Sequence, residues 1–440
     1  MSAAAPVAGL RVAIVNWRDP WRPDAGGAEQ YAWEMARGLA DRGAVVRFLT
    51  ARAPGQSRRD HRDGVTVTRW GGRFTVYPFA AGWLLAHRRS FDAVLDCQNG
   101  IPFFTPWVLP RRVPVLCVMH HVHTAQFLVH FPAALARVGQ FLEGPVARLA
   151  YRRHACVAVS PSTVTAMRER LRWRGPVYLV PNGAPEPAAV GGGLVGLGDP
   201  KTLVWVGRLV AHKRASRLLP LAERLRGQGL TIDVVGRGPD AEPLAASIAA
   251  AGLDGVLRLR GYLPEDGKRA LVAGALLHLS TSQGEGWGLC VLEAAALGVP
   301  TVAYDVDGLR DAVRDGETGW LVRAGEHLAD VTERAVKELA DPRRRAEMAA
   351  ACRAWAAQLT WPGAVDRMAA LVAASVRAGT AQCRHEQGRH GQAWIVTGRG
   401  GRVLAEGPVL DELLRRDPAA ALIRPATAAE RLAGRPDGPP

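Results

Sequence analysis

The sequence lacks the features that mark membrane-spanning and secreted proteins. No window reaches the roughly 18 uncharged apolar residues of a membrane span. The longest candidate, 101–110, is interrupted by prolines and followed by Arg111 and Arg112. The first ten residues lack the basic start and long apolar region of a signal peptide. The six cysteines are scattered without a C-x-x-C motif, which is typical of reduced thiols. We therefore expect a cytoplasmic protein.

Acidic residues are scarce relative to basic ones. The chain has 41 Asp and Glu against 56 Lys and Arg, a net charge of +15, and most of the excess falls in residues 1–190. A basic half of this kind could face anionic lipid, an anionic acceptor or nucleic acid. Arginines spread over solvated faces would produce the same charge, so both interpretations stay open.

One segment of the basic half, 79–91, carries Trp83, Leu84 and Leu85 beside Arg88 and Arg89. It allows two interpretations, a helix on an anionic membrane surface or a helix that covers a sheet. The first would place the protein peripherally on the inner face of the membrane.

The length of 440 residues exceeds one ordinary core, so two domains are expected. In each half, short runs rich in β-branched residues alternate with longer amphipathic segments, which indicates parallel sheets covered by helices on both faces. The fold class is therefore α/β, with two doubly wound, Rossmann-like domains facing a cleft. Ligands of such sheets bind at the carboxyl ends of the strands. The predicted strands are 11–16, 45–50, 65–69, 91–96, 113–120 and 156–160, then 201–207, 231–236, 256–261, 275–280 and 299–304.

The domain boundaries follow from composition. We expect an N-terminal domain over 1–183, a Gly/Pro-rich linker over 184–200 and a C-terminal domain over 201–360. A helix over 361–378 follows, and residues 379–440 form an accessory extension with no assigned chemistry. Within this extension we predict a hairpin over 393–405, a helix near 409–416 and a poorly ordered end from Arg424.

The most informative stretch is 283–293, where Glu285 and Glu293 stand eight positions apart around a glycine-rich turn. A strand-like run precedes it and a helix-like run follows it. This arrangement presents backbone N–H groups and a helix dipole to an anion. The glutamates add acceptors for sugar hydroxyls, Glu285 in the loop and Glu293 about one turn into the helix. The motif therefore indicates an enzyme that handles a sugar attached to a phosphate, whose oxygens would be bound by Gly286, Trp287, Gly288 and Leu289.

Two cations, Arg208 and Lys213, follow the predicted strand 201–207. Fixed cations of this kind can neutralise a departing nucleoside diphosphate without a metal. No D-x-D pair for Mg²⁺ occurs at a strand end, because Asp305 and Asp307 lie on the loop after a later strand. We therefore expect no metal cofactor. The alternative is that both cations are solvated loop residues.

Two further groups lie in the first half. Gly26 and Gly27 join the first strand to the first helix, where a ligand could approach the backbone, although a simple turn would also account for them. His120 ends the strand 113–120 and could bond a substrate hydroxyl or serve only the structure. His121 and His123 have the spacing of metal ligands, but no third ligand is evident.

Taken together, these residues resemble glycosyltransferase family 4, the retaining sugar-nucleotide enzymes of the GT-B fold. The resemblance covers roughly residues 10–375 and is strongest in Glu285-x7-Glu293. It rests also on 26–29, His120, the V-P-N-G stretch at 180–183 and the V-G-R-x4-K stretch at 206–213.

The resemblance implies metal-free transfer of a hexose from a nucleotide diphosphate sugar to an acceptor hydroxyl, with retention at the anomeric carbon. Arg208 and Lys213 would hold the diphosphate, Glu285 the donor sugar and Glu293 the ribose. His120 would touch the sugar, and Gly27 would let the N-terminal domain approach the phosphates. The acceptor is a glycan, a lipid-linked sugar or a small glycoside. No nucleic-acid partner is expected.

Some positions depart from the family pattern, namely Arg214, Arg237, Asp307-Gly308 and Asp311. They bear on the donor's identity more than on the reaction class. Two other functions stay open: a sugar-nucleotide epimerase of the same scaffold, and a non-catalytic nucleotide-sugar-binding protein.

Overall fold

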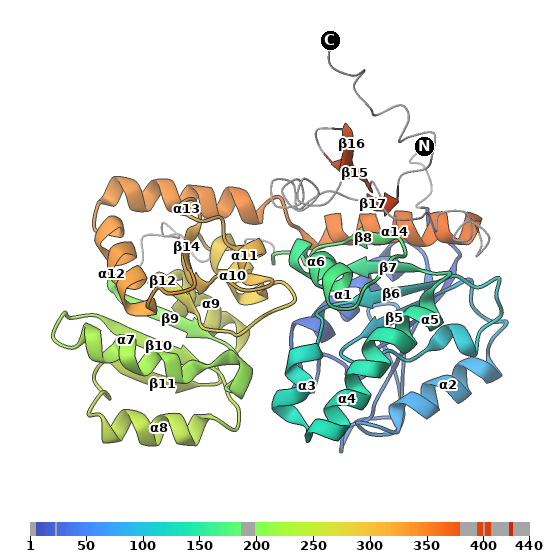
Figure 1. Ribbon diagram of the computed structural model, residues 1–440, viewed down its shortest axis with the longest axis horizontal. Helices are drawn as coiled ribbons and strands as arrows, with labels where there is room; N and C mark the ends of the chain where they lie inside the picture. Colours follow the sequence, from blue (N-terminus) through green and yellow to red (C-terminus); the bar gives the residue numbers. More distant parts are fainter. Residues whose placement is uncertain are drawn as a thin grey trace, which may run out of the picture. The chain divides into compact units, whose positions relative to one another are not determined.

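The computed structural model describes residues 6–22, 24–185 and 199–378, and three short strands at 394–398, 401–405 and 422–425. The chain divides into two compact units (Figure 1). The first unit comprises residues 1–182 and 361–440, and the second comprises 183–360. Each unit contains one β-sheet covered by helices, so the predicted α/β class with two Rossmann-like domains is confirmed.

The sheet of the first unit is parallel through its centre, in the order β8-β7-β6-β5-β1-β2-β4. These central strands are short and almost wholly buried, as expected for a parallel sheet covered on both faces. Their bounds are β1 (Arg11–Val15), β2 (Val45–Thr50), β4 (Val65–Arg69), β5 (Ala93–Gln98), β6 (Val115–Met119), β7 (Ala155–Ala158) and β8 (Val177–Leu179).

The two edges of this sheet depart from the all-parallel expectation. At one edge, β3 (Arg59–Arg62) pairs antiparallel with β4 and is polar throughout, so it gave no apolar signal in the sequence. At the other edge, β17 (Leu422–Pro425) pairs antiparallel with β8 and with β15 (Trp394–Gly398). Antiparallel pairing of β15 with β16 (Gly401–Ala405) confirms the predicted hairpin.

The C-terminal extension therefore contributes strands to the first sheet. The expectation of a poorly ordered end from Arg424 is wrong for Arg424 and Pro425, which belong to β17. The strand depends on pairing with partners far away in the sequence, which local composition does not reveal. The predicted helix near 409–416 lies outside the described residues.

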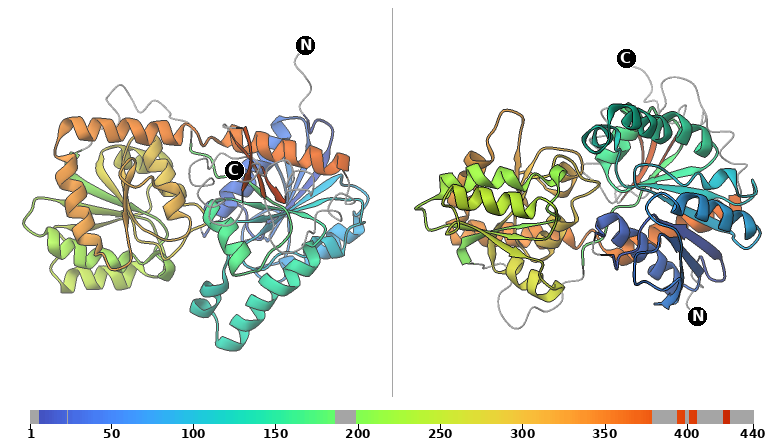
Figure 2. Two further views of the ribbon diagram at one scale, coloured as in Figure 1. Left: turned by 45° about the horizontal axis from the view of Figure 1, so that its top comes forward. Right: turned by 90° about the horizontal axis from the view of Figure 1, so that it is seen from below.

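Seven α-helices are described in the first unit. The last of them, α14, packs against α1, where Arg42 Nε donates to Asp366 Oδ1 at 2.8 Å. Figure 2 shows α3 and α4 standing away from the sheet. The helices are α1 (Gly27–Asp41), α2 (Val76–Ala86), α3 (Thr124–His130), α4 (Ala133–Phe141), α5 (Ala147–Tyr151), α6 (Pro161–Glu169) and α14 (Trp361–Ala378).

The segment 79–91 falls largely within α2, and the structure bears on its two interpretations. The helix buries Val76, Ala80 and Leu84, which recur every four residues and pack into the core beneath it. Trp83 stacks on His87 and lies under the guanidinium of Arg47. This segment therefore covers the sheet, as the second interpretation has it, and a membrane contact of its outer side stays a prediction.

The second unit has an all-parallel six-stranded sheet in the order β11-β10-β9-β12-β13-β14. The helices are α7 (Leu218–Leu225), α8 (Ala241–Ala250), α9 (Glu265–Ala273), α10 (Leu289–Ala296), α11 (Leu309–Ala312), α12 (Leu328–Leu339) and α13 (Pro342–Ala356). The strands are β9 (Asp199–Val206), β10 (Thr231–Val235), β11 (Leu257–Gly261), β12 (Ala275–Ser280), β13 (Thr301–Tyr304) and β14 (Gly319–Val322).

The strand order of each sheet locates its ligand-binding edge. In the second unit the order reverses between β9 and β12, and in the first unit between β5 and β1. Loops that leave the carboxyl ends at such a reversal diverge to opposite faces and open a crevice. Both glutamates and both cations of the second unit follow β9 or β12, and Gly26 and Gly27 follow β1.

Candidate functional site

The loops after β9 and β12 are joined in the second unit through Thr281. Its hydroxyl donates to the carbonyl oxygen of Lys213 at 2.7 Å and accepts from the indole N–H of Trp205 at 2.9 Å. The amide of Gln283 donates to the carbonyl of His212 at 2.8 Å. These three bonds bring together residues that are 68, 76 and 71 positions apart in the sequence.

Lys213 and Glu285 form an ion pair where these loops meet. The Lys213 ammonium donates to Glu285 Oε1, and each side chain retains 18% exposure. Ser282 Oγ donates to the same carboxylate oxygen at 2.6 Å. Burial opposes ionisation of both groups, but their mutual attraction outweighs it, so the pKa of Lys213 is raised and that of Glu285 is lowered. The pair is therefore charged at neutral pH.

Arg214, a departure from the family pattern, has a left-handed backbone with φ of 49°. This conformation explains why glycine would be common there. The arginine is held by two hydrogen bonds of 2.9 Å, in which Nε donates to the carbonyl of Thr281 and Nη2 donates to that of Ser282. Its guanidinium also lies over the Tyr304 ring. These contacts brace the loop beneath Lys213.

Helix α10 begins directly after the glycine-rich turn. Gly288 is the N-cap, with φ of 93°, and Leu289 is the first helical residue. The first N–H groups of a helix have no carbonyl of their own helix to bond, so they are available to an anion. The Trp287 indole is 2% exposed and packs in the core. Its side chain is thus structural, and only its backbone amide could contribute to the predicted phosphate site.

The loop after β13 reaches the same turn. The amide of Glu285 donates to the carbonyl of Asp307 at 2.9 Å. A Cβ atom on Gly308 would lie 2.4 Å from the Glu285 carbonyl oxygen, and the φ of Gly308 is 78°. A larger residue cannot occupy position 308 without displacing this turn, whereas Asp307 at the preceding position is compatible with it.

Glu293 lies one turn into α10 and pairs with a different cation. Lys268 of α9 donates to Glu293 Oε2 at 2.9 Å and lies 3.0 Å from Glu265 Oε1. Burial would lower the pKa of Lys268, but the Glu293 charge outweighs it and the pKa is raised. A cavity of about 390 Å³, counting its open mouth, lies beside this pair, and its lining includes Arg269 and Cys290.

The structure thus brings Lys213 and Glu285 together and places Glu293 in a second, neighbouring pair. Arg208 lies half-buried on the loop that leads to Lys213. Sequence reasoning missed Lys268, Ser282 and the bracing role of Arg214. Lys268 is distant in sequence from Glu293, and only the packing of α9 beside α10 connects them. The available signal was that Lys268 lies between the predicted strands 256–261 and 275–280, in a segment expected to be helical.

In the first unit, Gly26 is the N-cap of α1 and Gly27 its first residue. The side chain of Glu29 accepts from the amide of Gly26 at 2.7 Å and from Arg18 Nε at 3.0 Å. Arg18 and Glu29 are almost wholly buried, with side chains 6% and 1% exposed. A buried ion pair therefore fixes the shape of the glycine turn at the carboxyl edge of the first sheet.

His120 directly follows β6 and is 6% exposed. Its ring packs edge-on against Tyr31, with centroids 5.1 Å apart, and its Nε2 is buried without a hydrogen-bond partner. Burial, with a smaller contribution from His123, lowers the pKa of His120 to about 3. The imidazole is neutral at physiological pH, and its unsatisfied nitrogen suits a hydroxyl ligand.

The neighbouring histidines have structural surroundings. The amide of His123 donates to Glu143 Oε1 at 2.7 Å, and its Nδ1 lies 3.4 Å from that oxygen. The rings of His121 and His123 contact each other edge-on. Within the described ranges, no group of three or more His, Cys, Asp or Glu side chains could hold a metal ion.

The two units match two family models. Residues 25–186 match "Glycosyltransferase Family 4", and residues 195–355 match "Glycosyl transferases group 1". The D-inositol 3-phosphate glycosyltransferase of Gordonia bronchialis is 29% identical over 408 residues, which cover 81% of this chain and 87% of that protein.

Solved structures with a similar fold have low sequence identity to this chain. Sucrose-phosphate synthase from Thermosynechococcus elongatus has a TM-score of 0.71 at 19% identity, covering 84% of this chain and all of that one. Anabaena HepE, solved with UDP-glucose, has a TM-score of 0.62 at 18% identity, covering 83% of this chain and all of that one. These likenesses show the GT-B fold. With both units matched to its models, the chain belongs to glycosyltransferase family 4.

Proposed function

We propose that the protein transfers a hexose from a nucleotide diphosphate sugar to an acceptor hydroxyl, without a metal and with retention at the anomeric carbon. The carrying observation is the Lys213–Glu285 ion pair, positioned at the strand reversal beside the N-terminus of α10. A cation, a helix N-terminus and a hydroxyl-accepting carboxylate there suit a sugar diphosphate. The GT-B relative solved with UDP-glucose supports this donor class.

The donor would lie along the carboxyl edge of the second unit's sheet. Lys213 and Arg208 would bind the diphosphate, together with the first amides of α10. Glu285 would accept from a sugar hydroxyl while keeping its bond to Lys213, because one carboxylate accepts several hydrogen bonds. Glu293 would bind the ribose through the oxygen that Lys268 does not occupy. In the first unit, His120 would bond a substrate hydroxyl through Nε2.

In the transfer step, the acceptor oxygen forms a bond to the anomeric carbon while the bond from that carbon to the diphosphate oxygen breaks. The acceptor proton passes to the departing diphosphate, so no side chain need act as nucleophile. The fixed cations stabilise the negative charge that develops on the leaving group, and they do so best in a site from which water is excluded. The products are a glycoside and a nucleoside diphosphate.

The test is incubation with a panel of UDP-, GDP-, ADP- and TDP-hexoses and candidate acceptors, including an inositol phosphate, in buffer containing EDTA. We expect one donor to be consumed, with the same anomeric configuration in the product by NMR. Loss of activity in EDTA that Mg²⁺ restores would refute the metal-free step, and inversion would refute retention. Donor incubated alone should be inert or slowly hydrolysed, whereas its epimerisation would indicate an epimerase.

A further inference from the structure

Exposed large apolar side chains are distributed unevenly over the described part of the chain. All of them belong to the first unit except Tyr262. Single exposed apolar residues are ordinary on any protein surface, but a continuous group of them usually marks a binding surface. The group here lies on α4, α5 and the π-helical turn Leu142–Val146 that joins them.

In the helical segment 133–151, small residues face the protein and large apolar residues face outward, the reverse of the usual arrangement. Its buried side carries mainly small residues, including Ala136, Gly139, Ala147 and Ala150. Its outer side carries an apolar stripe that we call the α4–α5 face. A helix that packs on a protein normally turns its large apolar residues inward. The face consists of Leu135, Val138, Phe141, Pro145 and Leu149, and its members other than Pro145 are 53–59% exposed.

The small residues on the inner side have a packing reason. A Cβ atom on Gly139 would lie 2.8 Å from the ring of Phe127 on α3, so α3 and α4 are already in close contact. Glu143, wholly buried, anchors the same helical segment to the start of α3 through the amide of His123. The inner side is therefore filled, and the large residues of the α4–α5 face have no place within the unit.

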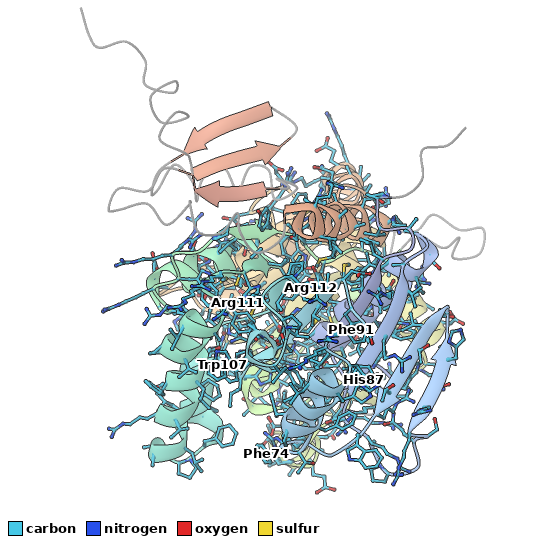
Figure 3. The ribbon with its side chains drawn as sticks, turned by 90° about the vertical axis from the view of Figure 1, so that its right-hand side faces the viewer. Phe74, His87, Phe91, Trp107, Arg111 and Arg112 are labelled. Atoms are coloured by element: carbon cyan, nitrogen blue, oxygen red, sulfur yellow. The ribbon has the colours of Figure 1, made fainter. Side chains whose placement is uncertain are left out.

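Positive charge accompanies this apolar face. Between residues 97 and 153 the only carboxylate is the buried Glu143, whereas arginines stand at 111, 112, 137, 148, 152 and 153. Trp107, which is 58% exposed, belongs to the 3-10 turn that packs against α5. In the view of Figure 3, Trp107 and Arg111 lie beside the teal helices of this segment.

We propose that the α4–α5 face, with its surrounding arginines, binds the surface of an anionic lipid bilayer. Apolar side chains on one helix face enter the boundary between headgroups and acyl chains, while nearby arginines bind lipid phosphates. Tryptophan favours that same boundary. A second copy of the chain would face these arginines with its own, and the repulsion disfavours it.

The test is co-sedimentation of the full chain with vesicles, in the absence of donor and acceptor so that it is independent of the proposed reaction. We expect binding to vesicles of phosphatidylcholine with 30% phosphatidylglycerol and at least tenfold weaker binding to phosphatidylcholine alone. Raising the salt concentration should weaken the binding, because surface charges are then screened. Equal binding to both vesicle types, or binding to neither, would overturn the proposal.

Variants locate the contact. The double variant Val138→Ser/Phe141→Ser should bind anionic vesicles at least tenfold more weakly, whereas Val45→Ser, at a site 64% exposed on β2, should bind like the wild type. Arg111→Gln/Arg112→Gln leaves the apolar residues of the α4–α5 face unchanged, and it should weaken vesicle binding and reduce the salt dependence of that binding. Unchanged binding in both double variants would overturn the proposal. So would lipid-free dimerisation of the wild type that the Val138/Phe141 variant loses, since a second copy would then cover the face.

Discussion

The two units share an α/β plan but differ in where their unusual residues lie. In the second unit, charged side chains pair at the carboxyl edge of the sheet, as Lys213 does with Glu285 and Lys268 with Glu293. In the first unit, a buried pair, Arg18–Glu29, shapes the glycine turn, and apolar residues are exposed on outer helices. Charge in the second unit thus gathers at the edge where we propose that a small polar ligand binds. In the first unit, the buried Arg18–Glu29 pair maintains a loop, and the arginines between residues 111 and 153 accompany an exposed apolar surface.

Breaking the buried pair of the first unit should have the largest effect. Glu29→Gln leaves the buried Arg18 with only the half-exposed Asp24, at 3.0 Å, as a charged partner, so we expect a loss of up to about 3 kcal/mol of unfolding free energy, less than for a buried charge with no partner left. The matched control is Glu34→Gln on the same helix, whose partner Arg37 is 45% exposed, and there we expect a change below about 1 kcal/mol. Denaturant unfolding measures both. Equal losses would show that the Glu29 pair has no special structural role.

Breaking the pair of the second unit should impair catalysis with little loss of stability. Lys213→Met removes a charge-assisted contact to phosphate worth about 1.5–3 kcal/mol, so kcat/KM should fall roughly 10- to 150-fold. Lys337→Met, on the exposed side of α12, should leave kcat/KM unchanged. Steady-state kinetics with saturating acceptor provides the comparison. A wild-type kcat/KM in Lys213→Met would exclude this lysine from the donor site.

Acid should destabilise each unit through its buried histidines. Burial lowers the pKa values of His120 in the first unit and His278 in the second to about 3, and that of His154 in the first unit to about 4. Below pH of about 6.5 the unfolded chain binds protons that the folded chain does not, so stability present at pH 7 is lost as pH falls towards 3. Each histidine should contribute a slope of up to about 1.4 kcal/mol per pH unit.

Hydrogen exchange between pH 7 and pH 5 assigns this slope to the units. His120→Asn should reduce the pH dependence of the first unit alone, where His154 keeps its own contribution, and His278→Asn should reduce that of the second alone. If both variants retain the wild-type slopes, other groups cause the acid sensitivity.

The smallest effect is expected for the second pair of the donor site. Lys268→Met should weaken donor binding by roughly threefold to tenfold, because Glu293 loses the hydrogen bond that orients its carboxylate, a change of about 0.6–1.4 kcal/mol. Lys268→Arg should restore most of the affinity. Titration calorimetry with the donor measures it, and tighter binding in Lys268→Met would mean that the lysine competes with the ribose.

Several parts of the site could be predicted because they are local in the chain. The strand, glycine turn and helix around Glu285 and Glu293 follow one another within about 20 residues, and β12 has the predicted bounds. The partners of these glutamates were less accessible. Lys213 was proposed to bind phosphate and turns out also to pair with Glu285, while Lys268 was missed. Both pairings depend on how loops from different strands meet, which no local pattern records.

The helix 133–151 shows the same limit on the surface. Its apolar residues would suit a helix that covers a core, and nothing in the local pattern says which side is already filled by Phe127 and Glu143. For 79–91 the sequence left two interpretations open, and only the packing of Ala80 and Leu84 into the core shows that this helix covers the sheet.

By itself, the sequence determined the α/β class, most strand positions and the loops that carry Arg208, Lys213, Glu285 and Glu293, because hydrophobic periodicity and turn residues act over short distances along the chain. Only the tertiary structure decided which charges pair, why Arg214 occupies a left-handed position and which apolar residues remain outside. Those outcomes depend on packing between segments far apart in the sequence, and the spacing of residues along the chain does not record such contacts.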